Sequence, residues 1–78
     1  MLTFEYEKAD EALHVHADPE GLRYLASVLL QLADRSENKG SDHVHLMTEA
    51  WGGNELSGEA QSKTSELLNH VKVFSWKS

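Results

Sequence analysis

The first part of the chain alternates between apolar and polar positions. Residues 2–7 carry an apolar side chain at every second position, and residues 12–17 do the same after a polar turn. A period of two is typical of a strand with one buried face. The two segments predict a β-hairpin, with Val15 facing the core and His14 and His16 facing the opposite, wetter side.

The apolar spacing changes to three and four beyond residue 18. Asp18 and Pro19 suit the N-cap and the first helical position, and Gly40 offers a C-terminal stop. The pattern predicts a long helix over residues 19–37. Its apolar stripe comprises Leu22, Leu25, Ala26, Leu29, Leu32 and Ala33, with Val28 and Leu30 widening it.

The second half of the chain predicts three further elements. Residues 43–48 and 70–76 alternate as strands, and the glycine pair within residues 51–54 favours a turn. Between them, Ser57 could cap a second, short helix. Its apolar stripe would consist of Ala60, Thr64, Leu67 and Leu68.

These elements predict an α+β fold in the order β-β-α-β-α-β. We expect a two-layer sandwich in which the long helix covers one face of a four-stranded mixed sheet. With 78 residues, the chain is too short to bury a second core, so residues 1–78 are expected to form a single domain.

Composition narrows the classes of partner. Thirteen acidic and seven basic residues give a formal charge of −6, and no basic patch is visible. Nucleic acid and membrane surfaces are therefore not expected as partners, whereas a basic protein is. The chain has no cysteine and no apolar run of roughly 20 residues, so we expect a cytoplasmic protein.

Two His-Val-His tripeptides are the most unusual feature. His14 and His16 lie in the second predicted strand, and His43 and His45 lie in the third. Side chains two residues apart on a strand share a face, so each pair could reach one metal ion, and all four could converge if the strands adjoin. The alternative is a set of solvated surface histidines, and we expect no bound metal or cofactor.

No catalytic centre is recognisable. The serines lack a nucleophile elbow, and Ser57 is better explained as a helix cap. Glu49 and Glu55 could form an acid/base pair, but glutamates in an acidic protein more often serve as solvated or capping groups. We therefore expect a non-enzymatic protein.

The segment from residue 51 to residue 57 allows two interpretations. It could be a structural turn in which Trp51 and Leu56 close the end of the core. It could also expose an aromatic side chain beside acidic groups, as in a binding hot spot for a basic protein. The candidate partner-binding residues are Trp51, Gly52, Gly53, Asn54, Glu55, Leu56 and Ser57.

The same segment carries a family resemblance. Residues 52–57, Gly-Gly-Asn-Glu-Leu-Ser, resemble the Gly-Gly-x-Glu-Leu-Ser motif of a small bacterial family of immunity proteins, numbered thirty-two among those encoded beside polymorphic toxins. Residues 43–48, Trp51 and residues 69–72 are similar to flanking parts of that family. The resemblance implies an α+β protein that binds and neutralises a cognate toxin, and the acidic charge suits a basic toxin such as a nuclease.

The leading hypothesis is thus an acidic, cytoplasmic immunity protein that binds a toxin through residues 51–57. One alternative is a metal-binding or metal-responsive module built on the four histidines. Another is a homodimer without a toxin partner, formed through the open sheet face or through the last strand, where Phe74 and Trp76 are apolar.

Overall fold

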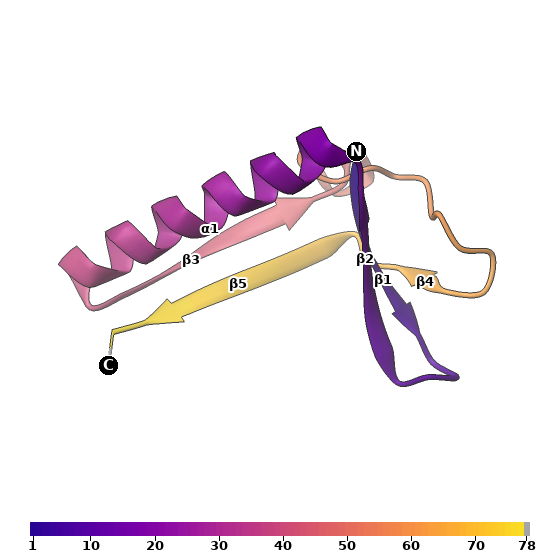
Figure 1. Ribbon diagram of the computed structural model, residues 1–78, viewed down its shortest axis with the longest axis horizontal. Coiled ribbons are helices and arrows are strands. Elements are labelled where there is room, and N and C mark those ends of the chain that lie inside the picture. Colours follow the sequence, from indigo (N-terminus) through magenta and orange to yellow (C-terminus); the bar gives the residue numbers. More distant parts are fainter. Residues whose placement is uncertain (78) are drawn as a thin grey trace.

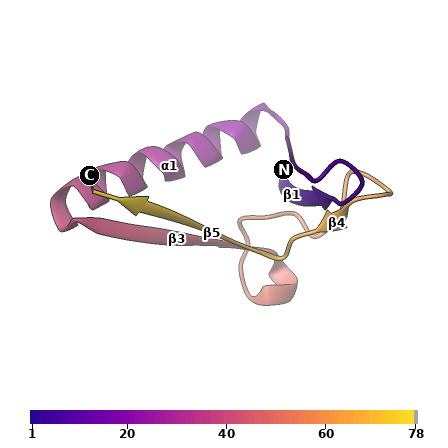
Figure 2. The same cartoon turned by 90° about the horizontal axis from the view of Figure 1, so that it is seen from below.

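A computed structural model describes residues 1–77 as one helix and two small antiparallel sheets. Helix α1 (Pro19–Lys39) lies along strands β3 (Ser41–Met47) and β5 (His70–Trp76), and the hairpin of β1 (Leu2–Glu7) and β2 (Ala12–Ala17) projects from one end of this unit (Figure 1). The turned view shows the same division (Figure 2). The molecule measures 41 × 24 × 24 Å.

The N-terminal hairpin has the predicted strands. β1 pairs with β2 antiparallel, with Phe4 opposite Val15 and Glu5 opposite His14. The alternation of β1 places Leu2 and Phe4 in the hydrophobic core, where Leu46 and Leu56 join them from the other half of the chain.

Helix α1 begins where its cap residues predict. The Asp18 carboxylate accepts a hydrogen bond of 2.8 Å from the Gly21 backbone N–H, and Pro19 is the first helical residue. The helix ends two residues later than expected, because Gly40 has a φ of 98° and donates its N–H to the Ser36 carbonyl. A positive φ of this kind suits glycine and stops the helix.

The C-terminal sheet is a pair of long strands backed by α1. β3 and β5 are antiparallel, with Val44 opposite Val73 and His45 opposite Lys72. Val44 and Val73 are half-buried, whereas His45 and Lys72 are exposed. The valines therefore share the face toward α1, and the histidine and lysine share the open face.

The prediction of one four-stranded mixed sheet is wrong. The structure has a sheet of order β2-β1-β4 and a separate sheet of order β3-β5, and all strand pairs in both are antiparallel. The alternation within each strand located the strands but contained no information about their neighbours. As a result, the His-Val-His segments of β2 and β3 belong to different sheets.

The prediction of a second helix is also wrong. Residues 57–65 form an irregular loop that leads into the short strand β4 (Glu66–Leu67), which pairs with β1. Serine and threonine side chains bond locally to the loop backbone, as Ser62 Oγ does to the Thr64 N–H at 3.2 Å. Such bonds compete with helical ones, and Gly58 weakens the helix further.

A buried carboxylate holds this loop in place. Glu5 of β1 is fully buried and accepts hydrogen bonds from the backbone N–H groups of Gln61 (2.9 Å) and Ser62 (3.2 Å). The hydroxyls of Ser65 (2.5 Å) and Thr3 (2.6 Å) donate to the same carboxylate. The loop thus covers the polar face of the first sheet.

The two faces of β2 point as expected, but they are covered differently from the expectation. Val15 is 43 % exposed, whereas His14 and His16 are half-buried on the face that they share with Glu5. The histidines of β2 were expected to face solvent and Val15 to face the core. Val15 does share the core face of Phe4, and the histidines do lie on the opposite face. The expected exposures are wrong, because the loop of residues 57–65 covers the polar face and Val15 lies beyond the cover of the core.

Candidate functional site

The backbone of the glycine pair explains the first half of the motif. A 3-10 turn, Glu49–Trp51, ends at Gly52, whose φ is 92°. At Gly53, a Cβ atom would lie 2.6 Å from the Met47 carbonyl oxygen and 2.7 Å from the Met47 Cβ. Gly52 is therefore required by conformation and Gly53 by the close approach to β3.

The second half of the motif ties the loop to both sheets. The Glu55 carboxylate accepts from the Met47 N–H at 2.9 Å, Leu56 is buried in the core, and the Ser57 N–H donates to the Leu2 carbonyl at 2.8 Å. The role proposed for Ser57 as a helix cap is wrong, since no helix follows it. Most of the motif therefore serves to hold the fold together.

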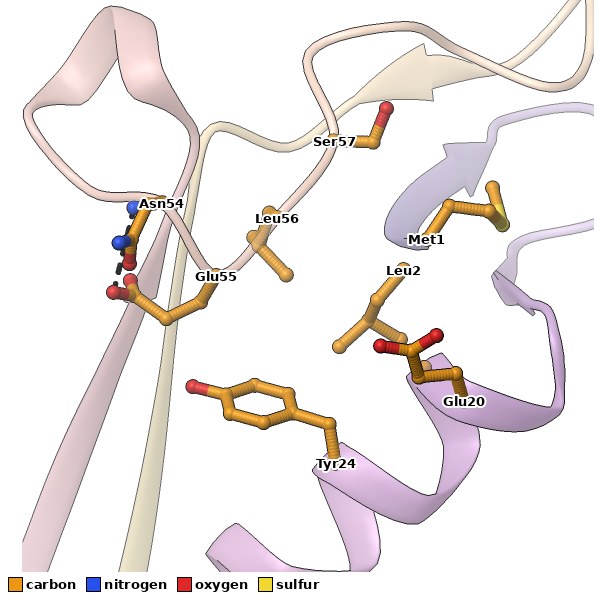
Figure 3. A pocket seen from close by; sticks show the side chains of 9 residues that line it. Met1, Leu2, Glu20, Tyr24, Asn54, Glu55, Leu56 and Ser57 are labelled. Carbon is orange, nitrogen blue, oxygen red and sulfur yellow. Dashed lines mark hydrogen bonds between the residues drawn. The ribbon is translucent and has the colours of Figure 1, made fainter.

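A pocket of about 550 Å³ lies between this loop and the start of α1. Glu55, Leu56 and Ser57 line it from one side, and Glu20 and Tyr24 line it from the helix (Figure 3). Partial burial and the nearby charge of Glu55 raise the pKa of the Tyr24 hydroxyl. The pocket is open and carries two carboxylates, which makes it unsuited to an anionic ligand.

Trp51, which directly precedes the glycine motif, is the candidate residue most available to a partner. Its side chain is 58 % exposed, and its ring centroid lies 5.9 Å from that of His70 on β5. Asn54 is also exposed, but Glu55 and Leu56 are committed to structural contacts. Of the seven candidate residues, the structure thus leaves Trp51 as the exposed aromatic group.

Trp51 is one end of a continuous line of rings on the open face of the β3-β5 sheet. Successive centroids along this line are 5.9, 5.1, 5.0, 5.5 and 6.2 Å apart. We call it the aromatic row. Its members, in order, are Trp51, His70, His45, His43, Phe74 and Trp76.

The row was only partly visible in the sequence. The apolar character of Phe74 and Trp76 was noted, but neither residue was joined to Trp51. His70 was missed as a link, although its ring stacks on the ring of His45, with the two centroids 5.1 Å apart. The period of two within residues 70–76 was the available signal, and the register between β3 and β5 was needed to place those side chains beside His43 and His45.

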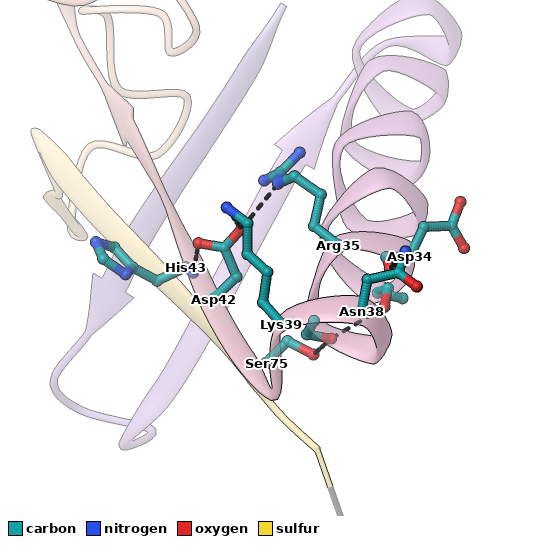
Figure 4. Close-up of polar contacts among 9 residues, drawn as sticks. Asp34, Arg35, Asn38, Lys39, Asp42, His43 and Ser75 are labelled. Atoms are coloured by element: carbon teal, nitrogen blue, oxygen red, sulfur yellow. Dashed lines mark hydrogen bonds and ion pairs between the residues drawn. The ribbon is translucent and has the colours of Figure 1, made fainter.

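A cationic side chain contacts the row. Lys72 lies 5.1 Å from the centroid of the Phe74 ring, a cation–π geometry. The Asp42 carboxylate is held on the helix side of β3 by Arg35 at 2.9 Å, while His43 projects from the other side (Figure 4). The Arg35 hydrogen bond is the main cause of the lowered pKa of Asp42.

The two central histidines touch directly. Nδ1 of His45 and Nε2 of His70 are 2.8 Å apart, so one nitrogen donates a proton and the other must be unprotonated. Desolvation by its neighbours, together with the charges of His43, Lys72 and His70, lowers the pKa of His45. The neutral form of His45 is thus favoured around pH 7.

The four histidines proposed as metal ligands do not converge. His14 and His16, with ring centroids 6.2 Å apart, lie on β2, while His43 and His45 lie on β3 in the other sheet. Among residues 1–77, no group of three or more histidine or acidic side chains is placed to hold a metal ion. The observed histidine neighbour of His45 is His70.

Comparison with known proteins places the chain in a family. No helix within residues 1–77 combines the length and the apolar character needed to cross a membrane. Neither the search of curated proteins nor the search of solved structures gave a match. Residues 12–71, which include the glycine motif and most of the described fold, match the family described as immunity protein 32. The chain therefore belongs to the immunity protein 32 family.

Proposed function

We propose that this protein neutralises a cognate toxin by binding it through the aromatic row, without catalysis. The observation that carries this proposal is the continuity of the row on an open sheet face. Trp51, Phe74 and Trp76 are 58 %, 51 % and 76 % exposed. Exposed tryptophans gathered in one line favour a protein interface, because aromatic anchors supply much of the energy of binding hot spots.

The helix and the loop contacts around the β3-β5 sheet hold the side chains of the row in place. α1 covers the opposite face of the β3-β5 sheet, and the Ser36 and Ser75 hydroxyls, 2.6 Å apart, join the helix to β5 (Figure 4). At the other end, Glu55 fastens the loop that carries Trp51. Side chains fixed on such a scaffold lose little conformational freedom on binding, which favours affinity.

The net charge of the chain supports a basic partner, such as a nuclease toxin. The centre of the interface with that partner would be apolar. The chain has a net charge of −6, while the centre of the row holds stacked rings with Lys72 beside them. Glu49 belongs to the same 3-10 turn as Trp51 and is exposed. An interface of this kind would bury the rings and leave the carboxylates to steer a basic toxin from its periphery.

The proposal is tested by inhibition of the toxin encoded beside this protein. We expect Trp51→Ala and Phe74→Ala each to raise the dissociation constant roughly 30-fold or more, while the variants keep the unfolding transition of the parent. Leu13→Ala is the matched control, because Leu13 is 56 % exposed on β2 and lies outside the row. Row variants that protect against the toxin as well as the parent protein does would exclude this surface.

A further inference from the structure

Helix α1 leaves half of its apolar stripe uncovered. Leu25 and Val28 pack against the core and Leu32 is 2 % exposed, but Leu22 and Leu29 are 53 % and 40 % exposed. The sequence predicted one broad stripe for a core, and the two small sheets cover only one side of it. Four of the uncovered apolar residues form a second stripe, the outer stripe, and the exposed Leu30 lies on its flank. The outer stripe consists of Leu22, Ala26, Leu29 and Ala33, all of them exposed.

The outer stripe has the spacing of a helix-pairing seam. Its members follow one another at intervals of four, three and four residues, the a/d pattern of paired helices. Leucine and alanine alternate along it. In an antiparallel pair, Leu22 and Leu29 of one helix would lie opposite Ala33 and Ala26 of the other, so that every layer combines a large and a small side chain.

The residues beside the outer stripe favour the same orientation. Arg23, Leu30 and Glu37 follow at intervals of seven on one flank, and neither charged residue has an ion-pair partner among residues 1–77. Helical side chains lean toward the N-terminus of their helix. In an antiparallel pair, Arg23 of one copy and Glu37 of the other therefore lean toward each other.

The chain exposes more surface than a compact monomer. Its accessible area is 5482 Å², against about 4,800 Å² for a compact monomer of this mass. Its radius of gyration is 13.5 Å, against about 11.5 Å for a compact domain of this length. The excess of roughly 700 Å² is close to the ~800 Å² that each partner contributes to a standard interface.

From these observations we infer that the protein is a homodimer in which α1 packs antiparallel on α1 of a second copy through the outer stripe. A two-fold axis between Ala26 and Leu29 makes the surface complementary to itself. The aromatic row lies on the face of the β3-β5 sheet away from α1, so it stays free in the dimer. The helix replaces the sheet face and the last strand as the expected dimer surface.

The inference is tested by the mass of the full chain in solution, which requires no toxin. Sedimentation equilibrium should give twice the 8.8 kDa of the chain at micromolar concentration. Leu29→Glu should raise the dimer dissociation constant roughly 100-fold. Leu13→Glu, which alters an exposed leucine outside the outer stripe, should leave the dimer intact. A parent that stays monomeric up to about 1 mM, or a Leu29→Glu dimer as tight as the parent, would overturn the inference.

Charge reversal tests the orientation without altering the apolar layer, and it applies even if Leu29→Glu fails to fold. Arg23→Glu should weaken the dimer several-fold, because two Arg23–Glu37 contacts become repulsive in a symmetric pair. Adding Glu37→Arg should restore most of the affinity. An unchanged dissociation constant in the single variant, or no recovery in the double variant, would exclude the antiparallel pair.

Discussion

The two sheets of this protein show how similar strand patterns can lead to opposite surfaces. β1 and β3 both alternate between apolar and polar residues. On β1 the polar residues Thr3 and Glu5 are fully buried under the loop of residues 57–65. On β3 the corresponding residues His43 and His45 stay exposed and join the aromatic row. A polar face is thus buried only where another segment supplies hydrogen-bond partners for its side chains.

The largest expected effect on stability comes from removing the Glu5 carboxylate, which holds the loop of residues 57–65 over the first sheet. Glu5→Ala leaves four donors without their acceptor, and we expect a loss of about 3 kcal/mol in the free energy of unfolding. His45→Ala, the matched change on the open sheet, should alter it by less than ~0.5 kcal/mol. Urea unfolding measures both, and equal losses would contradict the distinction between the covered and open faces.

The lowered pKa of the Glu5 carboxylate predicts that the protein loses stability in acid. Burial by itself raises the pKa of Glu5, but the hydrogen bonds from Gln61, Ser65, Thr3 and Ser62 outweigh it and lower the pKa from 4.5 to about 2. A lowered pKa stabilises the fold above pH 4.5, and this stability is lost as the pH falls from about 4.5 to 2. Denaturant unfolding across this range should show the loss, and Glu5→Gln should flatten that part of the pH profile.

A smaller effect is expected in the loop that joins the two sheets. Gly53→Ala forces a Cβ against the Met47 backbone and should destabilise the protein by about 2 kcal/mol. Gly58 is the matched control, because a Cβ there meets nothing within 4 Å, so Gly58→Ala should be close to neutral. The chemical-denaturation midpoints of the two variants measure the difference. Similar midpoints would mean that the contact between Gly53 and β3 is not required.

The smallest effect concerns protonation of the open face. The pKa of His45 is lowered by desolvation and by the charges of His43, Lys72 and His70, so its NMR titration should have a midpoint below 6.5. Lys72→Ala should raise that midpoint. Because the folded state resists protonation of His45, its contribution to stability is present above pH 6.5 and declines as the pH falls below that value. A midpoint at or above 6.5 would contradict the arrangement of charges around the row.

The candidate site could be predicted only in part. The glycine motif was found, and Trp51 beside it remains the exposed aromatic residue of the segment. The roles of Glu55 and Leu56 could not be seen, because the Met47 N–H and the core that they contact lie in other elements. The aromatic row required the register of β3 with β5, which joins His43 to Phe74 across the sheet. Local alternation contains no information about such pairs.

The sequence by itself determined where the main elements lie. The alternation of residues 2–7 and 70–76, the Asp18 cap and the Gly40 stop act over a few residues, and the structure forms the hairpin, the long helix and the last strand at these places. Tertiary structure alone decided which faces are covered. The bond from the Gln61 N–H to Glu5 spans 56 residues, and it favours an irregular loop over a second helix. Periodicity determines which side chains share a face, but only long-range contacts decide whether that face meets protein or water.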